Sequence, residues 1–135
     1  MCFFGQRKFV AAVSALKRAI YLDPFLSITA YNLGLVHLSL GQLASAFHFL
    51  SAAINLDPAF APAYHYLGVT LAKLGDLPHA KKAYARSLQI QDDYMTHLNF
   101  AASLCRVGEL GPAKGEFLEF ERQFRKLKEE EQESD

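Results

Sequence analysis

Histidine and cysteine are the side chains of this 135-residue sequence with the most chemistry to offer, because both bind metals and both serve in catalysis. The five histidines include no pair spaced i, i+4, and the two cysteines form no C-x-x-C motif. Cys105 and His97 lie eight residues apart, about two helical turns, which is too far for a nucleophile and its base. We therefore predict no catalytic residue, no metal site and no cofactor, and we interpret each histidine as a groove or packing residue.

The charge pattern gives no sign of a nucleic-acid or membrane partner. The formal net charge is zero, from 14 basic and 14 acidic residues. The acidic residues concentrate near the C-terminus, where Glu116, Glu119 and Glu121 are expected on a solvated face. There is no dense basic stripe, no apolar run long enough to span a bilayer, and no secretory signal at the start. These features predict a soluble cytosolic protein with reduced cysteines, no nucleic-acid partner and no direct membrane insertion.

Small residues recur along the chain at a fixed interval of 34 and then 33 residues. A glycine or alanine inside a helix at matching positions indicates that two helices approach closely there, since glycine otherwise costs about 1 kcal/mol in a helix. A second glycine series marks breaks between helices that need a positive φ. The predicted repeat-packing residues are Gly34, Gly68 and Ala101 on the first helices, Ala46, Ala80 and Ala113 as the small residues that face them on the second helices, and Pro24 and Pro58. The predicted breaks are Gly41, Gly75 and Gly108.

Helix pairs repeating every 34 residues are typical of the tetratricopeptide repeat. Apolar residues follow helical spacing between the glycines, and no segment alternates as a strand would. The sequence thus predicts an all-α tetratricopeptide-repeat solenoid of antiparallel helix pairs, truncated at its N-terminus. The expected units are a partial repeat at 1–26, mostly its second helix, full repeats at 27–60 and 61–93, a repeat with a long capping helix at 94–128, and an acidic tail at 129–135.

The two ends of the predicted array differ. The N-terminus begins within a helix pair, so either the chain is a fragment of a longer array or another surface covers that face. At the C-terminus, Phe117, Phe120, Phe124 and Leu127 form one apolar edge of a capping helix. The acidic residues beyond it are expected to be frayed and solvated, or alternatively to form an interaction tail.

The first helices of such an array line a concave groove. In a 34-residue unit the groove positions are the second, fifth, ninth, twelfth and thirteenth, and here they are mostly apolar with two cations. Such a groove suits a peptide, a helix or a neighbouring subunit better than a terminal carboxylate. Any single side chain could instead fill the gap between units. The predicted groove residues are Ile28, Tyr31, Leu35, Leu38, His65, Val69, Lys73, Leu98, Cys105 and Arg106.

Several stretches go beyond the generic repeat. "YNLGLVHL" and "ASAFHFLSAAIN" carry the most specific part of a resemblance that extends from Met1 to about Lys128, while "DPAFAPAYHYLGVTLAKLGDL" is closer to a generic repeat. On these stretches the chain resembles the C-terminal repeats of the Bardet–Biedl syndrome protein 4 family, tetratricopeptide-repeat subunits of the BBSome.

The resemblance implies a non-enzymatic scaffold. Its partners would be other BBSome subunits, together with pericentriolar and microtubule-transport proteins, in trafficking of membrane proteins and assembly of the cilium. The implied location is the cytoplasm and the cilium, including its basal body and the centrosome region. Two alternatives stay open on the sequence: a generic tetratricopeptide adaptor in an unrelated complex, and a repeat arm detached from an enzyme.

Overall fold

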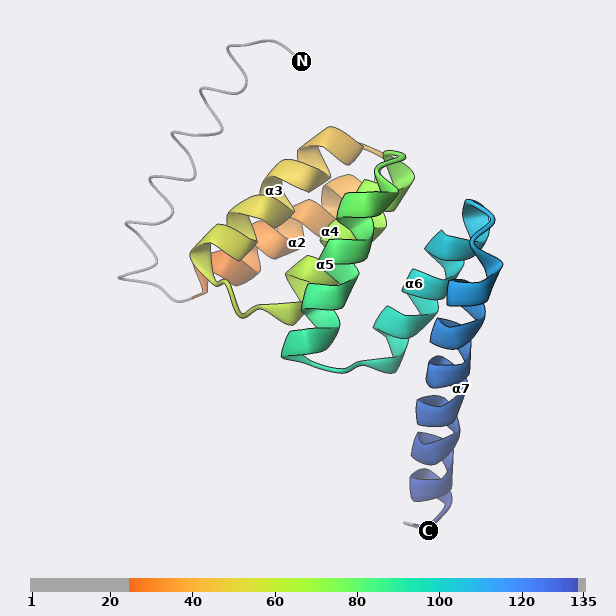
Figure 1. Ribbon diagram of the computed structural model, residues 1–135. Helices are drawn as coiled ribbons and strands as arrows, with labels where there is room; N and C mark the ends of the chain where they lie inside the picture. The colour runs from red at the N-terminus through yellow and green to blue at the C-terminus, as the bar shows by residue number, and fades with distance from the viewer. Residues whose placement is uncertain (1–24, 134–135) are drawn as a thin grey trace, which may run out of the picture.

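The computed structural model describes residues 25–133 of the chain, and every regular element among them is an α-helix (Figure 1). The prediction of an all-α tetratricopeptide-repeat solenoid is confirmed. Nearly all of the partial repeat expected at 1–26, with Pro24, lies outside the described residues. The helices are α2 (Leu26–Ser39), α3 (Leu43–Leu56), α4 (Ala61–Lys73), α5 (Leu77–Ile90), α6 (Tyr94–Arg106) and α7 (Leu110–Glu133).

Short turns divide the helices into three antiparallel pairs, α2 with α3, α4 with α5, and α6 with α7. Each turn holds a glycine in the left-handed region, with φ of +76° at Gly41, +85° at Gly75 and +84° at Gly108. In the first turn, Gly41 N–H donates to the Leu38 carbonyl, and the next N–H, of Gln42, donates to His37. This Schellman arrangement satisfies the last carbonyls of each first helix and confirms the three predicted breaks.

Between pairs the chain leaves a second helix in extended conformation. Asp57 has φ −138° and ψ 92°, as expected for a residue that precedes a proline, here Pro58. The following helix then starts with a proline in its first turn, where the missing N–H costs nothing. The "LDP" stretch therefore sets where one unit ends and the next begins.

Close packing within each pair explains the glycines inside the helices. A Cβ added at Gly34 would lie 2.8 Å from Leu50 Cγ, and one added at Gly68 would lie 3.0 Å from the Tyr84 ring. The residues that face the glycines most closely are thus Leu50 and Tyr84, in place of the alanines expected there. Those alanines, Ala46, Ala80 and Ala113, are nevertheless buried, as is Ala101 in the third unit.

One aromatic side chain joins the second pair to the third. Tyr84 of α5 is fully buried, and its ring stacks on Phe100 of α6 with centroids 4.8 Å apart. Its hydroxyl lies 2.9 Å from Ser103 Oγ, which itself donates to the Asn99 carbonyl. The same ring therefore packs against its own unit at Gly68 and against the next unit at α6.

The last helix, α7, is much longer than its partner α6, and its C-terminal half extends beyond the other helices (Figure 1). Tyr94 at the start of α6 contacts the rings of Phe120 and Phe124, at centroid distances of 6.0 Å each. The helix continues to Glu133, so it includes residues 129–133, which are exposed. Of the helices within residues 25–133, none combines the length and the apolar character that a membrane crossing requires.

Candidate protein-binding surface

The first helices of the three pairs, α2, α4 and α6, lie next to one another and present what we call the groove face. Five predicted groove residues, Tyr31, Leu35, Leu38, Val69 and Leu98, are half-buried on these helices. Four more, Ile28, Lys73, Cys105 and Arg106, are exposed. The structure thus places nine of the ten at the surface, in full or in part.

Tyr31 links the first two units on this face. Its ring meets Phe60 edge-on with centroids 5.0 Å apart and lies 6.0 Å from the ring of Tyr66. Burial, together with the nearby Tyr66, raises the pKa of Tyr31 to about 12. Its hydroxyl therefore stays neutral at any physiological pH. The side chain both packs between the two units and forms part of the surface.

A hollow of about 290 Å³ opens on the groove face between α4 and α6. It brings together three of the predicted groove residues, one apolar and two cationic: Val69, Lys73 and Arg106. Its remaining walls come from Tyr66, Tyr84, Asn99, Ala102 and Ser103. A wall of aromatic, amide and cationic groups can bind a polypeptide by contacting both the side chains and the backbone carbonyls of that polypeptide.

Two of these lining residues, Tyr66 and Asn99, were not predicted from the sequence. They occupy the same position of successive units, the sixth, next to the fifth-position His65 and Leu98. That shared position, polar in both units, is the signal that could have identified them. Four predicted groove residues of α2 do not line this hollow: Ile28, Tyr31, Leu35 and Leu38.

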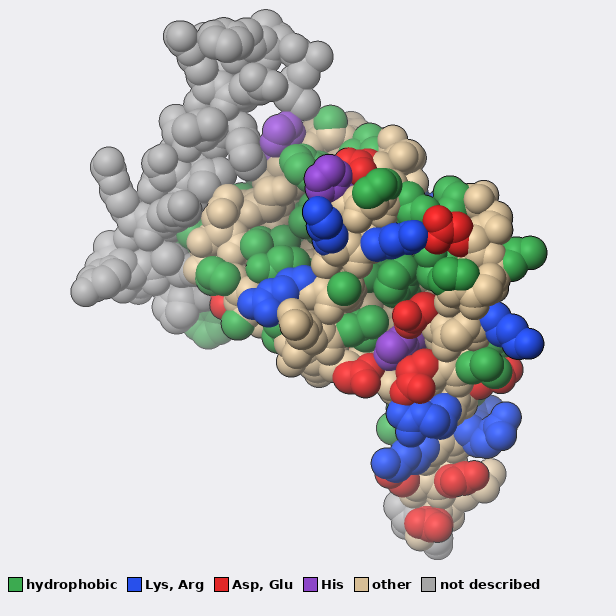
Figure 2. Space-filling model, in the orientation of Figure 1, with side chains coloured by type: hydrophobic (Ala, Val, Ile, Leu, Met, Phe, Trp, Pro, Cys, Tyr) green, Lys and Arg blue, Asp and Glu red, His purple; other side chains and the backbone are tan. Residues whose placement is uncertain are grey.

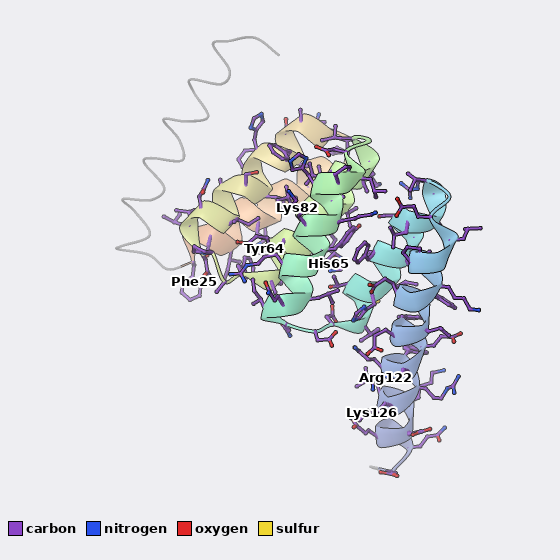
Figure 3. The ribbon with its side chains drawn as sticks, viewed as in Figure 1. Phe25, Tyr64, His65, Lys82, Arg122 and Lys126 are labelled. Atoms are coloured by element: carbon purple, nitrogen blue, oxygen red, sulfur yellow. The ribbon has the colours of Figure 1, made fainter. Side chains whose placement is uncertain are left out.

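His65 differs from the other predicted groove residues because it is only 5% exposed. Its Nε2 lies 2.6 Å from Asn99 Nδ2, which donates, so Nδ1 carries the proton and donates to Thr96 Oγ1 at 2.8 Å. Burial lowers the pKa of His65, against the opposing charge of Asp93. His65 is thus a neutral residue that fills the space between α4 and α6 (Figure 3). For this residue, the alternative of filling the gap between units describes the structure better than a place on the groove surface.

His97 joins α6 to α7 through two carboxylates. Its Nδ1 lies 2.5 Å from Glu116 Oε2, and its Nε2 lies 2.7 Å from Asp92 Oδ1. Since both partners accept, both ring nitrogens carry protons. Burial acts to lower the pKa of His97, but the bonds to Glu116 and Asp92 outweigh it and the pKa is raised. Glu116 was expected on a solvated face, and the structure corrects this because it is tied to a buried ring.

Asp92, His97 and Glu119 offer one ligand atom each within 4.8 Å of one another. Their carboxylates already have protein donors, because Gln123 donates to Asp92 at 3.1 Å and to Glu119 at 3.2 Å. Arg122 also bonds Glu119 and, with Gln123, lowers the pKa of that carboxyl to about 2. Glu119, which was expected on a solvated face, is therefore instead bonded to Arg122 and Gln123. The cluster is a structural ion network, which the sequence could not reveal because its members come from a loop and two helices.

The class of protein follows from this architecture. Helix pairs with glycine turns, packed side by side into an open groove, define a tetratricopeptide-repeat protein. The tetratricopeptide-repeat family matches at residues 29–60 and again at residues 61–94. A crystal structure of MamA is similar, with a TM-score of 0.67 and 25% identity over 85% of this chain and 70% of that chain. A second structure, titled MamA MSR-1 C2, has a TM-score of 0.68 at 20% identity, over 92% and 72% of the two chains.

Sequence relatives define the family more narrowly. The chain is 48% identical over 96% of its length to BBSome complex member BBS4 of Xenopus tropicalis, and 46% identical over 95% to that of Mus musculus. It is 34% identical over 94% to the homologue of Drosophila melanogaster. The chain belongs to the Bardet–Biedl syndrome protein 4 family, and it spans about a quarter of the length of these curated relatives. These relatives and the repeats point to a non-catalytic scaffold family.

Proposed function

We propose that this chain acts as a scaffold within the BBSome, holding other subunits of that complex through the groove face. The observation that carries the proposal is its 48% identity, over nearly its whole length, to a protein named as a member of that complex. The groove face supplies the contact surface in this proposal, because it is open, partly apolar and bordered by Lys73 and Arg106. Such surfaces bind by burying apolar side chains and pairing charges at their borders.

In this proposal the chain performs no catalysis and acts in the trafficking of ciliary membrane proteins and in cilium assembly. Pericentriolar and microtubule-transport proteins are further proposed partners. The location that follows is the cytoplasm and the cilium, with its basal body and the centrosome region. The support for each of these is the same family membership, and the groove residues named from the sequence, apart from the buried His65, are the proposed contacts.

Substitutions on the groove face test which surface is used. Lys73→Glu with Arg106→Glu reverses both cations that line the hollow, and Leu35→Glu places a charge on the half-buried surface of α2. We expect each to reduce recovery of BBSome subunits at least about tenfold, since unpaired charges in an interface cost several kcal/mol. Lys114→Glu, an exposed reversal on α7, is the matched control. Full recovery with both groove variants would show that the contact lies elsewhere.

A further inference from the structure

A second hollow lies on the opposite side of the helix pairs from the groove face, between the second helices α3 and α5. Its volume is about 470 Å³, within the range of sites that hold a small ligand or a few side chains. We call it the α3–α5 hollow. It is lined by Phe47 and Ser51 of α3, by Tyr64, Leu67 and Leu71 of α4, and by Asp76, His79, Lys82, Ala83 and Arg86 at the turn and on α5.

The floor of the α3–α5 hollow is apolar. Phe47, Tyr64 and Leu67 are half-buried there, while Leu71 and Ala83 are almost fully buried. Phe47 and Leu67 also pack against the core around Tyr84. Since that core holds these side chains in place, the floor is formed before anything binds and would lose little entropy on binding.

The rim of the α3–α5 hollow is positively charged. Lys82 and Arg86 are one turn apart on α5 and exposed, and neither has an acidic partner among residues 25–133. Arg86 lies over the ring of Tyr64, 5.9 Å from its centroid. Asp76, the acidic lining residue, is paired with His79 at 2.8 Å. Figure 2 shows basic side chains beside hydrophobic ones on this face, and Figure 3 labels Tyr64 and Lys82.

We propose that the α3–α5 hollow binds an acidic segment of a partner protein, with one or two bulky apolar side chains in the hollow and neighbouring carboxylates on Lys82 and Arg86. The charge of the rim selects the sign of the partner, because an apolar segment with basic flanks would meet two unpaired cations. The apolar floor requires that the segment also carry a large apolar residue. This site is separate from the groove face, so it does not rest on the proposed function.

The acidic residues 129–133 at the end of α7 do not meet these requirements. Residues 129–133 continue α7 as a helix and carry no large apolar side chain among their acids. Residues 129–133 are therefore not the proposed occupant of the α3–α5 hollow.

The test uses the 135-residue chain and a fluorescein-labelled heptapeptide amide of sequence EDFEDLE. One control peptide replaces every acid by lysine, and another replaces its phenylalanine and leucine by serine. Fluorescence anisotropy measures binding to the unsubstituted chain, to Lys82→Glu with Arg86→Glu, and to Lys73→Glu with Arg106→Glu, which makes the same change of charge on the groove face. Ser51→Trp fills the hollow without altering its charge. Circular dichroism confirms that each variant is helical.

We expect the acidic peptide to bind at least about tenfold more tightly than either control peptide. The Lys82/Arg86 variant and Ser51→Trp should each weaken it at least about tenfold, and the Lys73/Arg106 variant less than about twofold. The proposal is overturned if the acidic peptide does not bind, if it binds all variants alike, or if the Lys73/Arg106 variant alone weakens it. Self-association of the chain that depends on Lys82 and Arg86 would instead assign the hollow to a second copy.

Discussion

Three polar side chains, His65, Tyr84 and His97, carry side-chain hydrogen bonds from one helix to a later one. His65 and Tyr84 bond residues of α6 in the next unit, and His97 bonds Glu116 of α7. None of the buried side-chain nitrogen and oxygen atoms of residues 25–133 lacks a hydrogen-bond partner. Such pairing is what makes buried polar groups tolerable, because an unpaired one costs roughly 1–3 kcal/mol. The sequence identified the histidines as packing or groove residues, but their partners lie 19 and 31 residues away and could not be inferred from local spacing.

The glycines inside the helices give the sharpest prediction at this scale. Gly34→Ala places a methyl group against the fully buried Leu50, whose backbone N is also only 3.3 Å away. We expect a loss of up to about 2 kcal/mol in the free energy of unfolding, because an overpacking cost of about 1–3 kcal/mol is offset by a gain of about 1 kcal/mol in helix propensity. Urea denaturation measures it. The same substitution at Gly115 of α7, where a Cβ meets nothing within 4 Å, should stabilise by up to about 1 kcal/mol.

If the Gly34→Ala and Gly115→Ala variants had the same free energy of unfolding, the close approach of α2 and α3 would not explain why residue 34 is a glycine. The comparison separates packing from propensity, since both positions are helical and differ in what a methyl group would touch.

His97 predicts a dependence of stability on pH with a defined sign. Its folded pKa is raised above the ordinary value of 6.5, so its contribution is complete below pH 6.5 and is lost as the pH rises through the folded pKa. The difference in unfolding free energy between the unsubstituted chain and His97→Gln should therefore be largest near pH 6 and shrink toward alkaline pH. Urea denaturation across that range tests this.

His65 serves as an internal control for the direction in which stability changes with pH. Its folded pKa is lowered, so its contribution is present above pH 6.5 and is lost as the pH falls below that value. His65→Asn should accordingly cost more at pH 8 than at acid pH. A His97→Gln difference that grew with pH would show that the ring is not held protonated between Glu116 and Asp92.

At the scale of elements, the helix boundaries were the most predictable part. Gly41, Gly75 and Gly108 signal the turns because a positive φ suits only glycine well, and the expected breaks match the structure. The stacking of Tyr84 on Phe100 was less predictable, because its contact spans two units and depends on how far one pair rotates on the next. The groove was predictable in part for the same reason: repeat positions indicate a face but not which side chain the next helix covers, as with His65.

Tyr84 tests how tightly the second and third pairs are joined. Tyr84→Phe keeps the ring on Phe100 and removes its 2.9 Å hydrogen bond to Ser103. We expect a loss of about 1 kcal/mol in unfolding free energy, the usual net value of one buried hydrogen bond. Tyr64→Phe, which removes an exposed bond to the Pro58 carbonyl, should cost less than about 0.5 kcal/mol. Equal costs at the two positions would contradict an energetic role for the Tyr84 bond.

At the scale of the whole molecule, the helix pairs present two faces of different chemistry. The groove face has aromatic, amide and cationic groups around Tyr66, Asn99 and Arg106. The α3–α5 hollow has an apolar floor beneath Lys82 and Arg86. A scaffold needs more than one such face, because it must contact one neighbour without losing its hold on another. The overall fold was predictable since every unit repeats the same small-residue positions, whereas the two surfaces depend on side chains that differ between units.

The most direct test of the account is affinity purification of the tagged chain from ciliated cells, with mass spectrometry of the proteins that accompany it. The unsubstituted chain should recover several BBSome subunits, and the Lys73→Glu, Arg106→Glu variant should recover at least about tenfold less of them. If the unsubstituted chain recovers no BBSome subunit, a scaffold role of this chain in that complex is contradicted.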